Sequence, residues 1–301
     1  MSNIAEKDTV DFPQLSEWLK SKHEAYQDLY EKIRTNVRAK ASAKSLDSTA
    51  DAVQALLNSD ISSADKEQMT AAQKYIIGRF IVDRAPLLLG RHRHQCMRDA
   101  ILKNFRRIEQ SIIDEKSDYA NYDFFVKDIA YVYGELIPCG APSVSLNGEA
   151  SVRSLLSHEA LKAYPNPFAW AKATFQLGRK WFRPHTDSRV LEEFNEAGWD
   201  KCYKYIAVLL EENPDMLGMA GTGWFYDPQI LHISPRLGYL QARPLERGAF
   251  LFRHGPDPFY TAMAVEKSET RRKLVEEGKY IPQGYSLIWP REALLNWAKN
   301  N

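Results

Sequence analysis

The chain has 301 residues, of which 44% are hydrophobic and 26% are charged, and its formal net charge is +1. This composition is typical of a folded globular protein, and the near-zero net charge argues against a general attraction to nucleic acid or to anionic membranes. Cys96, Cys139 and Cys202 form no CxxC pair, which argues against a disulfide framework and a cysteine-rich zinc site. Because no signal peptide and no apolar stretch of roughly 20 residues is evident, we expect a cytoplasmic protein without a membrane span.

The first part of the chain is expected to be helical. Apolar residues recur with helical spacing after the potential capping residue Asp11, and Pro13 suits the first turn of that helix. A further helix is expected from about residue 64 to 82, ending before Pro86, because the residue before a proline disfavours the helical conformation. The clearest amphipathic pattern lies at residues 92–114, with apolar side chains in steps of four, four, three and four: Met97, Ile101, Phe105, Ile108 and Ile112.

The stretch 138–148 is rich in turn-forming residues and marks a domain boundary. We therefore expect a helical N-terminal region at residues 1–145 and a second domain at residues 146–301. In the second domain, strand-like segments alternate with helix-like segments, of which 188–212 is the longest. Because parallel strands need crossover connections, the alternation predicts an α/β fold with a mixed or mainly parallel sheet and flanking helices, with α+β as the alternative.

Polar and aromatic residues follow four strand-like segments of this second domain. The segments are 181–187, 219–227, 249–257 and 285–291. If all four strands run parallel, their polar ends meet at one edge of the sheet, where open α/β sheets bind ligands. The pattern therefore predicts an enzyme that acts on a small anionic or amino-acid-like substrate at this edge.

His185 and Asp187 lie two residues apart, so on a strand their side chains share a face. With His254 they resemble the HxD…H pattern of non-haem iron oxygenases that use 2-oxoglutarate. That resemblance implies a divalent metal as cofactor, a jelly-roll barrel, and Arg271 or Arg272 as the partner of a co-substrate carboxylate. In the alternative interpretation His185 is a polar residue at a strand end and Asp187 caps the next helix.

The Gly-Thr-Gly-Trp-Phe-Tyr-Asp sequence that starts at Gly221 predicts a surface where backbone and aromatic rings approach a ligand. Trp224 and Tyr226 are expected to form a stacking wall for the substrate. Asp227 is a candidate catalytic base or ligand, and the alternative is that it caps the helix that begins near Pro228.

Arg253 and His254 stand at a strand end before a glycine turn. The guanidinium group suits an anionic part of the substrate, and the imidazole suits proton transfer near neutral pH. His185 and His254 are therefore the candidate acid–base residues. Arg291 is expected to bind substrate at the same edge, or else to be a solvated residue in the first turn of a helix.

The basic residues between positions 91 and 107 give the N-terminal region a local positive patch. A solvated helix face, a protein partner or a second copy of the chain fits this patch better than nucleic acid does, because the whole chain is nearly neutral. In that non-enzymatic alternative the protein binds a ligand or partner through its helical region, and charge reversal at Arg106 and Arg107 weakens the complex.

The chain contains no GxSxG elbow, no GxxxxGK[ST] phosphate loop and no HExxH sequence, which argues against serine hydrolases, P-loop nucleotidases and zincins. The segment 271–289, however, resembles the last helix and strand of GNAT-type acyltransferases. The resemblance implies an acyl-CoA donor and transfer of its acyl group to an acceptor. Three enzyme alternatives therefore remain: a proton-transferring enzyme of undefined class, a metal-dependent oxygenase and an acyltransferase.

Overall fold

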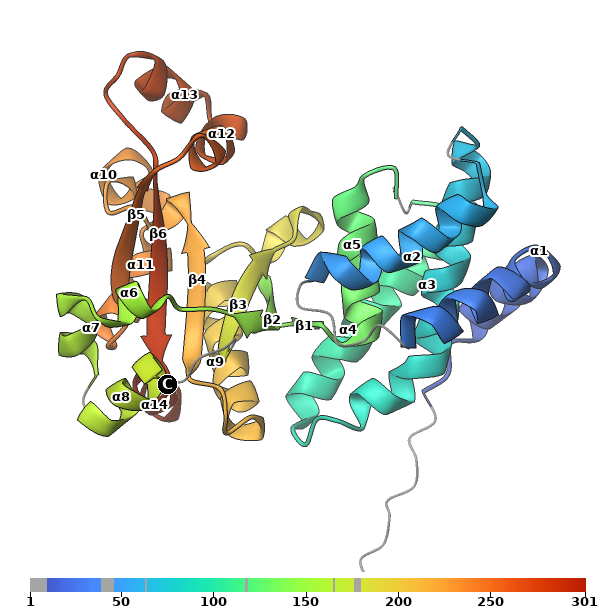
Figure 1. Cartoon of the computed structure of the whole chain (residues 1–301), viewed down its shortest axis with the longest axis horizontal. Coiled ribbons are helices and arrows are strands. Elements are labelled where there is room, and N and C mark those ends of the chain that lie inside the picture. The colour runs from blue at the N-terminus through green and yellow to red at the C-terminus, as the bar shows by residue number, and fades with distance from the viewer. Residues whose placement is uncertain (1–9, 39–45, 63, 117–118, 165, 176–179) are drawn as a thin grey trace, which may run out of the picture. The chain divides into compact units, whose positions relative to one another are not determined.

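The computed structural model describes the whole chain except residues 1–9, 39–45, 63, 117–118, 165 and 176–179 (Figure 1). The chain divides into two compact units, Met1–Pro138 and Cys139–Asn301, and each unit is described by itself. The boundary that the sequence suggested, between residues 145 and 146, falls inside a strand of the second unit, β2 (Pro142–Gly148).

Unit 1 is helical, as its sequence predicted. Its elements are α1 (Pro13–Arg38), α2 (Leu46–Asp60), α3 (Lys66–Leu89), α4 (Gln95–Ile113), α5 (Tyr122–Tyr133) and the short strand β1 (Leu136–Pro138). All five apolar residues of the predicted α4 stripe are buried. The expected stop before Pro86 is wrong, because α3 continues to Leu89. Ala85, Leu88 and Leu89 are buried there, and their packing outweighs the hydrogen bond that the proline removes.

Unit 2 begins with β2 and three short helices, α6 (Val152–Leu155), α7 (His158–Ala163) and α8 (Pro167–Phe175). The middle of the unit contains β3 (Trp181–Thr186), η1 (Ser188–Glu193), α9 (Glu196–Glu212), β4 (Gly218–Gly223), η2 (Trp224–Tyr226), α10 (Ile230–Ile233), η3 (Pro235–Leu237) and α11 (Tyr239–Glu246). The unit ends with β5 (Phe250–Pro256), α12 (Pro258–Glu266), α13 (Glu269–Glu276), β6 (Gln283–Pro290) and α14 (Arg291–Lys299).

The strands of unit 2 form one mixed sheet in the order β2-β3-β4-β6-β5. Strand β3 pairs in parallel with β4, whereas β6 pairs antiparallel with both β4 and β5. Strands β3, β4 and β5 therefore run in one direction and β6 runs in the other. A mixed sheet with flanking helices confirms the predicted α/β class, but the expectation that all four polar segments run parallel is wrong for β6. Helices α12 and α13 both lie beyond one end of the sheet, so the chain re-enters as an antiparallel neighbour of β5 (Figure 1).

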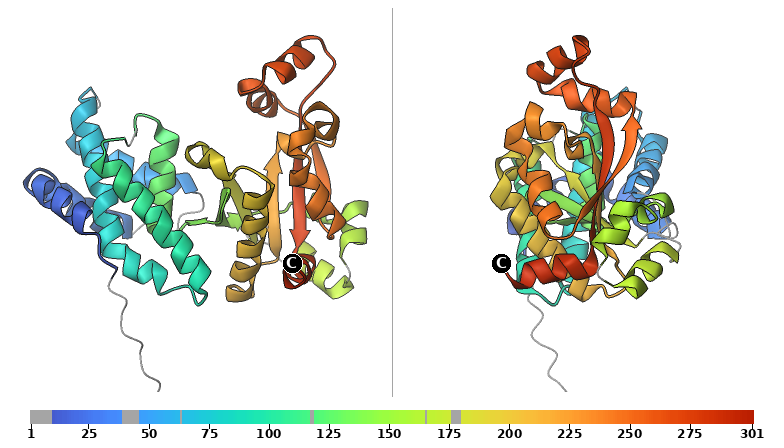
Figure 2. Two further views of the ribbon diagram at one scale, coloured as in Figure 1. Left: turned by 180° about the vertical axis from the view of Figure 1, so that it is seen from behind. Right: turned by 90° about the vertical axis from the view of Figure 1, so that its left-hand side faces the viewer.

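Helices cover the two faces of the sheet in separate groups (Figure 2). On the α6–α8 face, Leu155, Ala160 and Ala173 join a buried cluster with Ala220 and Ile288 of the strands. On the α9 face, the rings of Tyr203, Trp289 and Trp297 pack edge to face or tilted, with centroids between 5.2 and 6.1 Å apart. These two faces set the positions of all candidate site residues.

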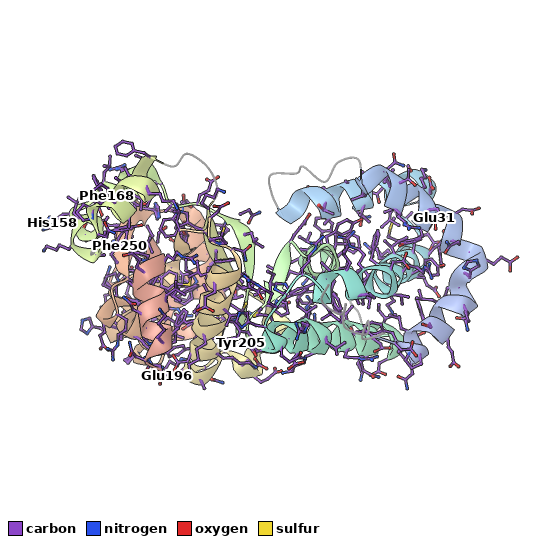
Figure 3. The ribbon with its side chains drawn as sticks, turned by 90° about the horizontal axis from the view of Figure 1, so that it is seen from below. Glu31, His158, Phe168, Glu196, Tyr205 and Phe250 are labelled. Carbon is purple, nitrogen blue, oxygen red and sulfur yellow. The ribbon has the colours of Figure 1, made fainter. Side chains whose placement is uncertain are left out.

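Phe250 of β5 belongs to the buried cluster of the α6–α8 face, whereas Phe168 of α8 projects outward and is 85% exposed (Figure 3). Helices α6–α8 therefore bury the part of the sheet near Phe250. Side chains farther along β3, β4 and β5 on the same face are more exposed, including Arg183, Thr222 and His254.

Candidate active site

The parallel strands β3 and β4 pair over a short distance and then separate. Their register joins Trp181 with Gly218 and Phe182 with Met219. Farther along, residues 183–186 of β3 pair with β2, while residues 220–223 of β4 pair with β6. The edges of β3 and β4 that face each other therefore lack ladder partners beyond Phe182 and Met219. We call this part of the sheet, residues 183–186 and 220–223, the strand divergence (Figure 1).

Pro184 and Gly221 occupy the strand divergence on its α9 face. Pro184 has no backbone N–H, so it suits a strand position where the ladder is interrupted. A Cβ atom added to Gly221 would lie 2.9 Å from the hydroxyl oxygen of Tyr226 and 3.4 Å from Cγ of Pro184. The Tyr226 hydroxyl is therefore placed directly at the divergence by the short η2 turn that follows β4.

Tyr226 is 1% exposed, and burial raises the pKa of its phenol above the ordinary value of 10.0. The hydroxyl therefore stays protonated across the physiological range and is able to donate a hydrogen bond. The sequence predicted Tyr226 as part of a substrate wall, together with Trp224. The ring of Trp224 is covered by the guanidinium group of Arg271, whose Cζ atom lies 4.4 Å from the ring centroid.

A chain of three side chains crosses the other face of the sheet. The Nε2 atom of His254 lies 2.7 Å from Oγ of Ser286, which lies 2.7 Å from Oγ1 of Thr222. The three residues stand on β5, β6 and β4, which are adjacent in the sheet. His254 is at a β-bulge, since the register with β6 shifts between Arg253 and Gly255, and bulges commonly re-aim a side chain. Partial burial lowers the pKa of His254, so its imidazole is neutral at pH 7.

His185 of β3 also pairs with a serine, but this chain of hydrogen bonds ends at an asparagine. Its Nε2 atom lies 2.9 Å from Oγ of Ser145, and this hydroxyl donates to Oδ1 of Asn147 at 2.6 Å. Because the serine has one proton, which goes to Asn147, the His185 Nε2 atom acts as the donor in this pair. The chain of hydrogen bonds therefore runs from His185 to Asn147.

The predicted metal triad is not assembled. Strand β3 ends at Thr186, and the Asp187 carboxylate accepts hydrogen bonds from the backbone and guanidinium groups of Arg189 at 2.8 to 3.0 Å. Asp187 thus caps η1, as the alternative interpretation expected. Among the residues that the structure describes, no group of three His, Cys, Asp or Glu side chains is placed to hold a metal ion. Metal ligation by His185, Asp187 and His254 therefore stays a prediction without an assembled ligand set among the described residues, and the open mixed sheet differs from the barrel that the oxygenase resemblance implies.

The helix expected at residues 188–212 is also interrupted. It consists of the 3-10 turn η1 and the helix α9, which is capped by Asn195 through a 3.0 Å bond from the Gly198 N–H. Asp187 caps the first turn of η1, and Asn195 caps the first turn of α9. The segment therefore forms two separate helical pieces.

Asp227 is 1% exposed and follows the η2 turn, which comes after β4. Its Oδ1 atom accepts a hydrogen bond from the backbone N–H of Gln229 at 3.0 Å, and its backbone oxygen accepts one from the Gln241 side chain at 3.0 Å. Burial raises the pKa of Asp227, while the Gln229 N–H and the Tyr280 hydroxyl act in the opposite direction. Asp227 therefore occupies a capping position, and its catalytic role stays a prediction.

The two predicted substrate arginines lie at opposite ends of the sheet. Arg253 is on β5, where its Nε donates to the side-chain oxygen of Gln283. Arg291 follows β6, and because β6 runs antiparallel, it stands at the far end from His254. Its guanidinium group donates to the backbone oxygens of Asn213 and Met216 at 3.2 and 3.3 Å. Arg291 is thus separated from the other candidate residues and fixes the loop before β4.

Three side chains near the divergence were missed by the sequence analysis: Arg183, Thr222 and Ser286. A signal for them exists, because each is a polar residue at an alternate position of an otherwise apolar or glycine-rich strand. Thr222 lies between two glycines, in a segment whose pattern predicts ligand contacts by backbone and aromatic rings and not by a hydroxyl. Ser286 lies opposite Thr222 in the β4–β6 register, which no sequence pattern indicates.

The basic patch of unit 1 is largely engaged in contacts of its own. Arg98 donates to the backbone oxygens of His92 and Arg93, while Arg106 pairs with Glu109 at 2.8 Å and Arg107 with Asp128 at 3.4 Å. Among the described helices, none combines the length and the apolar composition that crossing a lipid bilayer requires.

Comparison with known proteins adds no assignment. No protein family, curated protein or solved structure matches the chain significantly.

Proposed function

We propose that unit 2 is an acyltransferase that takes an acyl group from a pantetheine thioester, such as an acyl-CoA, and transfers it to a small acceptor. The observation that carries this proposal is the strand divergence, in which two parallel neighbours in the middle of the sheet stop pairing after Phe182 and Met219. Tyr226 lies at the divergence on the α9 face, and on the other face His254 is linked to Thr222 of the divergence through Ser286.

The unpaired strand edges favour an extended ligand that carries amide groups. Backbone N–H and C=O groups inside a sheet need hydrogen-bond partners, and an extended chain is able to supply them by adding itself to the strand. The pantetheine arm of CoA is such a chain, since it is narrow and contains two amide groups. Pro184 reduces the number of donors on β3, so carbonyl groups dominate that edge and suit the amide N–H groups of the arm.

The resemblance of segment 271–289 to GNAT-type acyltransferases supports the same proposal. This segment comprises most of α13 and β6, and β6 lies beside β4 in the sheet. The resemblance implies an acyl-CoA donor, and the pantetheine arm of such a donor suits the divergence of β3 and β4. The metal-dependent alternative has no assembled ligand set among the residues that the structure describes.

In the proposed reaction, the nucleophile of the acceptor attacks the thioester carbonyl carbon and its proton goes to His254. The carbon–sulfur bond then breaks with its electron pair leaving on sulfur, the Tyr226 hydroxyl donates a hydrogen bond to the thiolate, and the thiolate takes a proton from solvent. The raised pKa of Tyr226 keeps its hydroxyl protonated as a hydrogen-bond donor, and the lowered pKa of His254 keeps the imidazole ready to accept a proton. The products are the acylated acceptor and the free thiol.

The proposal is tested by calorimetric titration of the full chain with CoA and, separately, with 3′-phosphoadenosine 5′-diphosphate, which lacks the pantetheine arm. We expect CoA to bind at least about tenfold more tightly, which corresponds to about 1.4 kcal/mol contributed by the arm. Equal affinities, or no binding of CoA, would contradict insertion of the arm. Binding of CoA without thiol release from acetyl-CoA, with any amine acceptor, would favour a binding protein instead.

A further inference from the structure

On the α6–α8 face, a continuous chain of hydrogen bonds between side chains connects the strand divergence to His254. Thr222 is exposed on β4 at the edge that faces β3. Its hydroxyl bonds to buried Ser286, and Ser286 bonds to His254, with 2.7 Å at each step. A hydroxyl is at once a donor and an acceptor, so two hydroxyls in series are able to pass a proton from one end to the other.

The tautomer of the imidazole at its end sets the direction of this chain of hydrogen bonds. The ring of His254 packs edge to face on Phe252, with centroids 5.3 Å apart, and its partial burial favours the neutral form. A neutral imidazole whose Nε2 lacks a proton accepts from Ser286, which in turn accepts from Thr222. The lone pair of Thr222 that remains is then available to a donor at the divergence.

The second histidine does not offer the same path. The Ser145 proton is held by Asn147 at 2.6 Å, so the His185 Nε2 atom donates in its bond to Ser145. A proton that arrives from the divergence would find no acceptor at Nε2 of His185. The two histidines on this face are therefore not equivalent, and the geometry selects His254.

Arg183 lies across the divergence from Thr222 on the same face. It stands on β3 opposite Ser145 and two residues before His185. Among the described residues, its guanidinium group has no hydrogen-bond or ion-pair partner. Burial raises the pKa of Tyr260 of α12, and the charge of Arg183 acts against this rise. Asp257, which acts on Tyr260 in the opposite direction, caps α12 through the Phe259 N–H at 2.8 Å. This side of the divergence thus presents an uncompensated cation to a ligand.

We propose that the acceptor of the acyl transfer is a small primary amine with a carboxylate group that binds on the α6–α8 face beside the divergence. Arg183 binds the carboxylate, and Thr222 and Ser286 relay the proton of the amine to His254. This inference rests on the proposed acyltransferase function. As the amine nitrogen forms its bond to the thioester carbon, its proton moves to Thr222, the Thr222 proton to Ser286, and the Ser286 proton to His254. His254 becomes cationic and returns the proton to solvent after the thiol leaves.

The test measures thiol release from acetyl-CoA by the full chain, with the proteinogenic amino acids as acceptors and their carboxamides as uncharged counterparts. We expect release with amino acids and a loss of at least about tenfold in kcat/KM with the carboxamides. Arg183→Met should remove this difference by raising KM for the acids alone. Carboxamides that react as well as the acids would overturn the assignment of Arg183.

Three variants test the relay. Thr222→Val and Ser286→Ala should each lower kcat by on the order of 10- to 100-fold while leaving KM for acetyl-CoA unchanged. Thr222→Ser keeps the hydroxyl and should retain most of the wild-type kcat. Ser145→Ala breaks the other histidine–serine pair and serves as the control, which should keep wild-type activity.

The outcomes separate this inference from the function on which it rests. Equal effects of Thr222→Val and Thr222→Ser, or a loss with Ser145→Ala as large as with Ser286→Ala, would overturn the relay. Binding of CoA with no thiol release from any of the amino acids would overturn the acceptor class but leave the donor site in place. Failure of CoA to bind would contradict the acyltransferase proposal itself.

Discussion

The hydroxyl of Tyr226 lies over Gly221, at 2.9 Å from the point where a Cβ atom would be. Glycine is therefore required at position 221 by a side chain five residues later, since any larger residue would displace the phenol. The same contact places a hydrogen-bond donor at the level where β3 and β4 have already separated. In the proposed reaction this is the level that the sulfur atom of the donor reaches.

Substitution of Gly221 by valine should block the strand divergence. The valine methyl groups would occupy the space now shared by the Tyr226 hydroxyl and Cγ of Pro184. We expect affinity for CoA to fall by at least about tenfold, with a destabilisation of roughly 1–3 kcal/mol from overpacking. Circular dichroism and thermal unfolding verify that the variant is folded. A folded variant with wild-type affinity for CoA would place the arm elsewhere.

The role of the Tyr226 hydroxyl is separable from its packing by two matched substitutions. Tyr226→Phe removes the hydroxyl at the divergence, and we expect kcat to fall by on the order of 10- to 100-fold. Tyr203→Phe removes a hydroxyl that is also buried on the α9 side and has no hydrogen-bond partner among the described residues. That variant should keep its activity and be as stable as wild type or more so, because an unsatisfied polar group is lost. The two variants are compared by steady-state kinetics and chemical unfolding.

The pH dependence of kcat follows from the two shifted groups. His254 must be neutral to accept a proton, and burial lowers its pKa below the ordinary 6.5, so kcat should fall only below about pH 6.5. Tyr226 must be protonated, and burial raises its pKa above 10.0, so the alkaline loss should begin only above about pH 10. Activity is therefore expected to be level between pH 7 and pH 9. A loss of kcat centred near pH 8 would indicate a different acid or base.

Arg291→Met tests the position of Arg291 at the far end of the sheet. The variant removes the donors to the backbone oxygens of Asn213 and Met216, which remain partly buried. We expect a loss of roughly 1–3 kcal/mol in the free energy of unfolding, measured by denaturant titration. KM for the acceptor should stay unchanged in the folded variant. A specific rise in this KM without a loss of stability would restore Arg291 as a substrate-binding residue.

Local pattern was sufficient to predict the helical first unit and the mixed α/β character of the second. The stripe from Met97 to Ile112 is buried along one helix, because helical periodicity places those residues on one face whatever they pack against. The polar residues at the ends of β3, β4 and β5 do stand at one edge of the sheet, because these three strands share a direction.

Sequence patterns could not predict the contacts between segments that are distant in the chain. The direction of β6 depends on where α12 and α13 pack. Because β6 runs antiparallel to β5, Arg291 lies at the end of the sheet opposite to His254. The bond between Thr222 and Ser286 joins residues 64 positions apart and depends on the β4–β6 register. Asp187 is a different case, since its partner Arg189 is two residues away and capping was foreseeable from the local sequence.

The central claim is that a pantetheine thioester lies between β3 and β4. The most direct measurement is the change in backbone amide chemical shifts of the isotopically labelled full chain when acetyl-CoA is added. We predict that the largest changes occur at residues 183–186 and 220–223, except at Pro184, which has no amide proton. Saturable binding that leaves these residues unchanged, or no binding at all, would contradict the account.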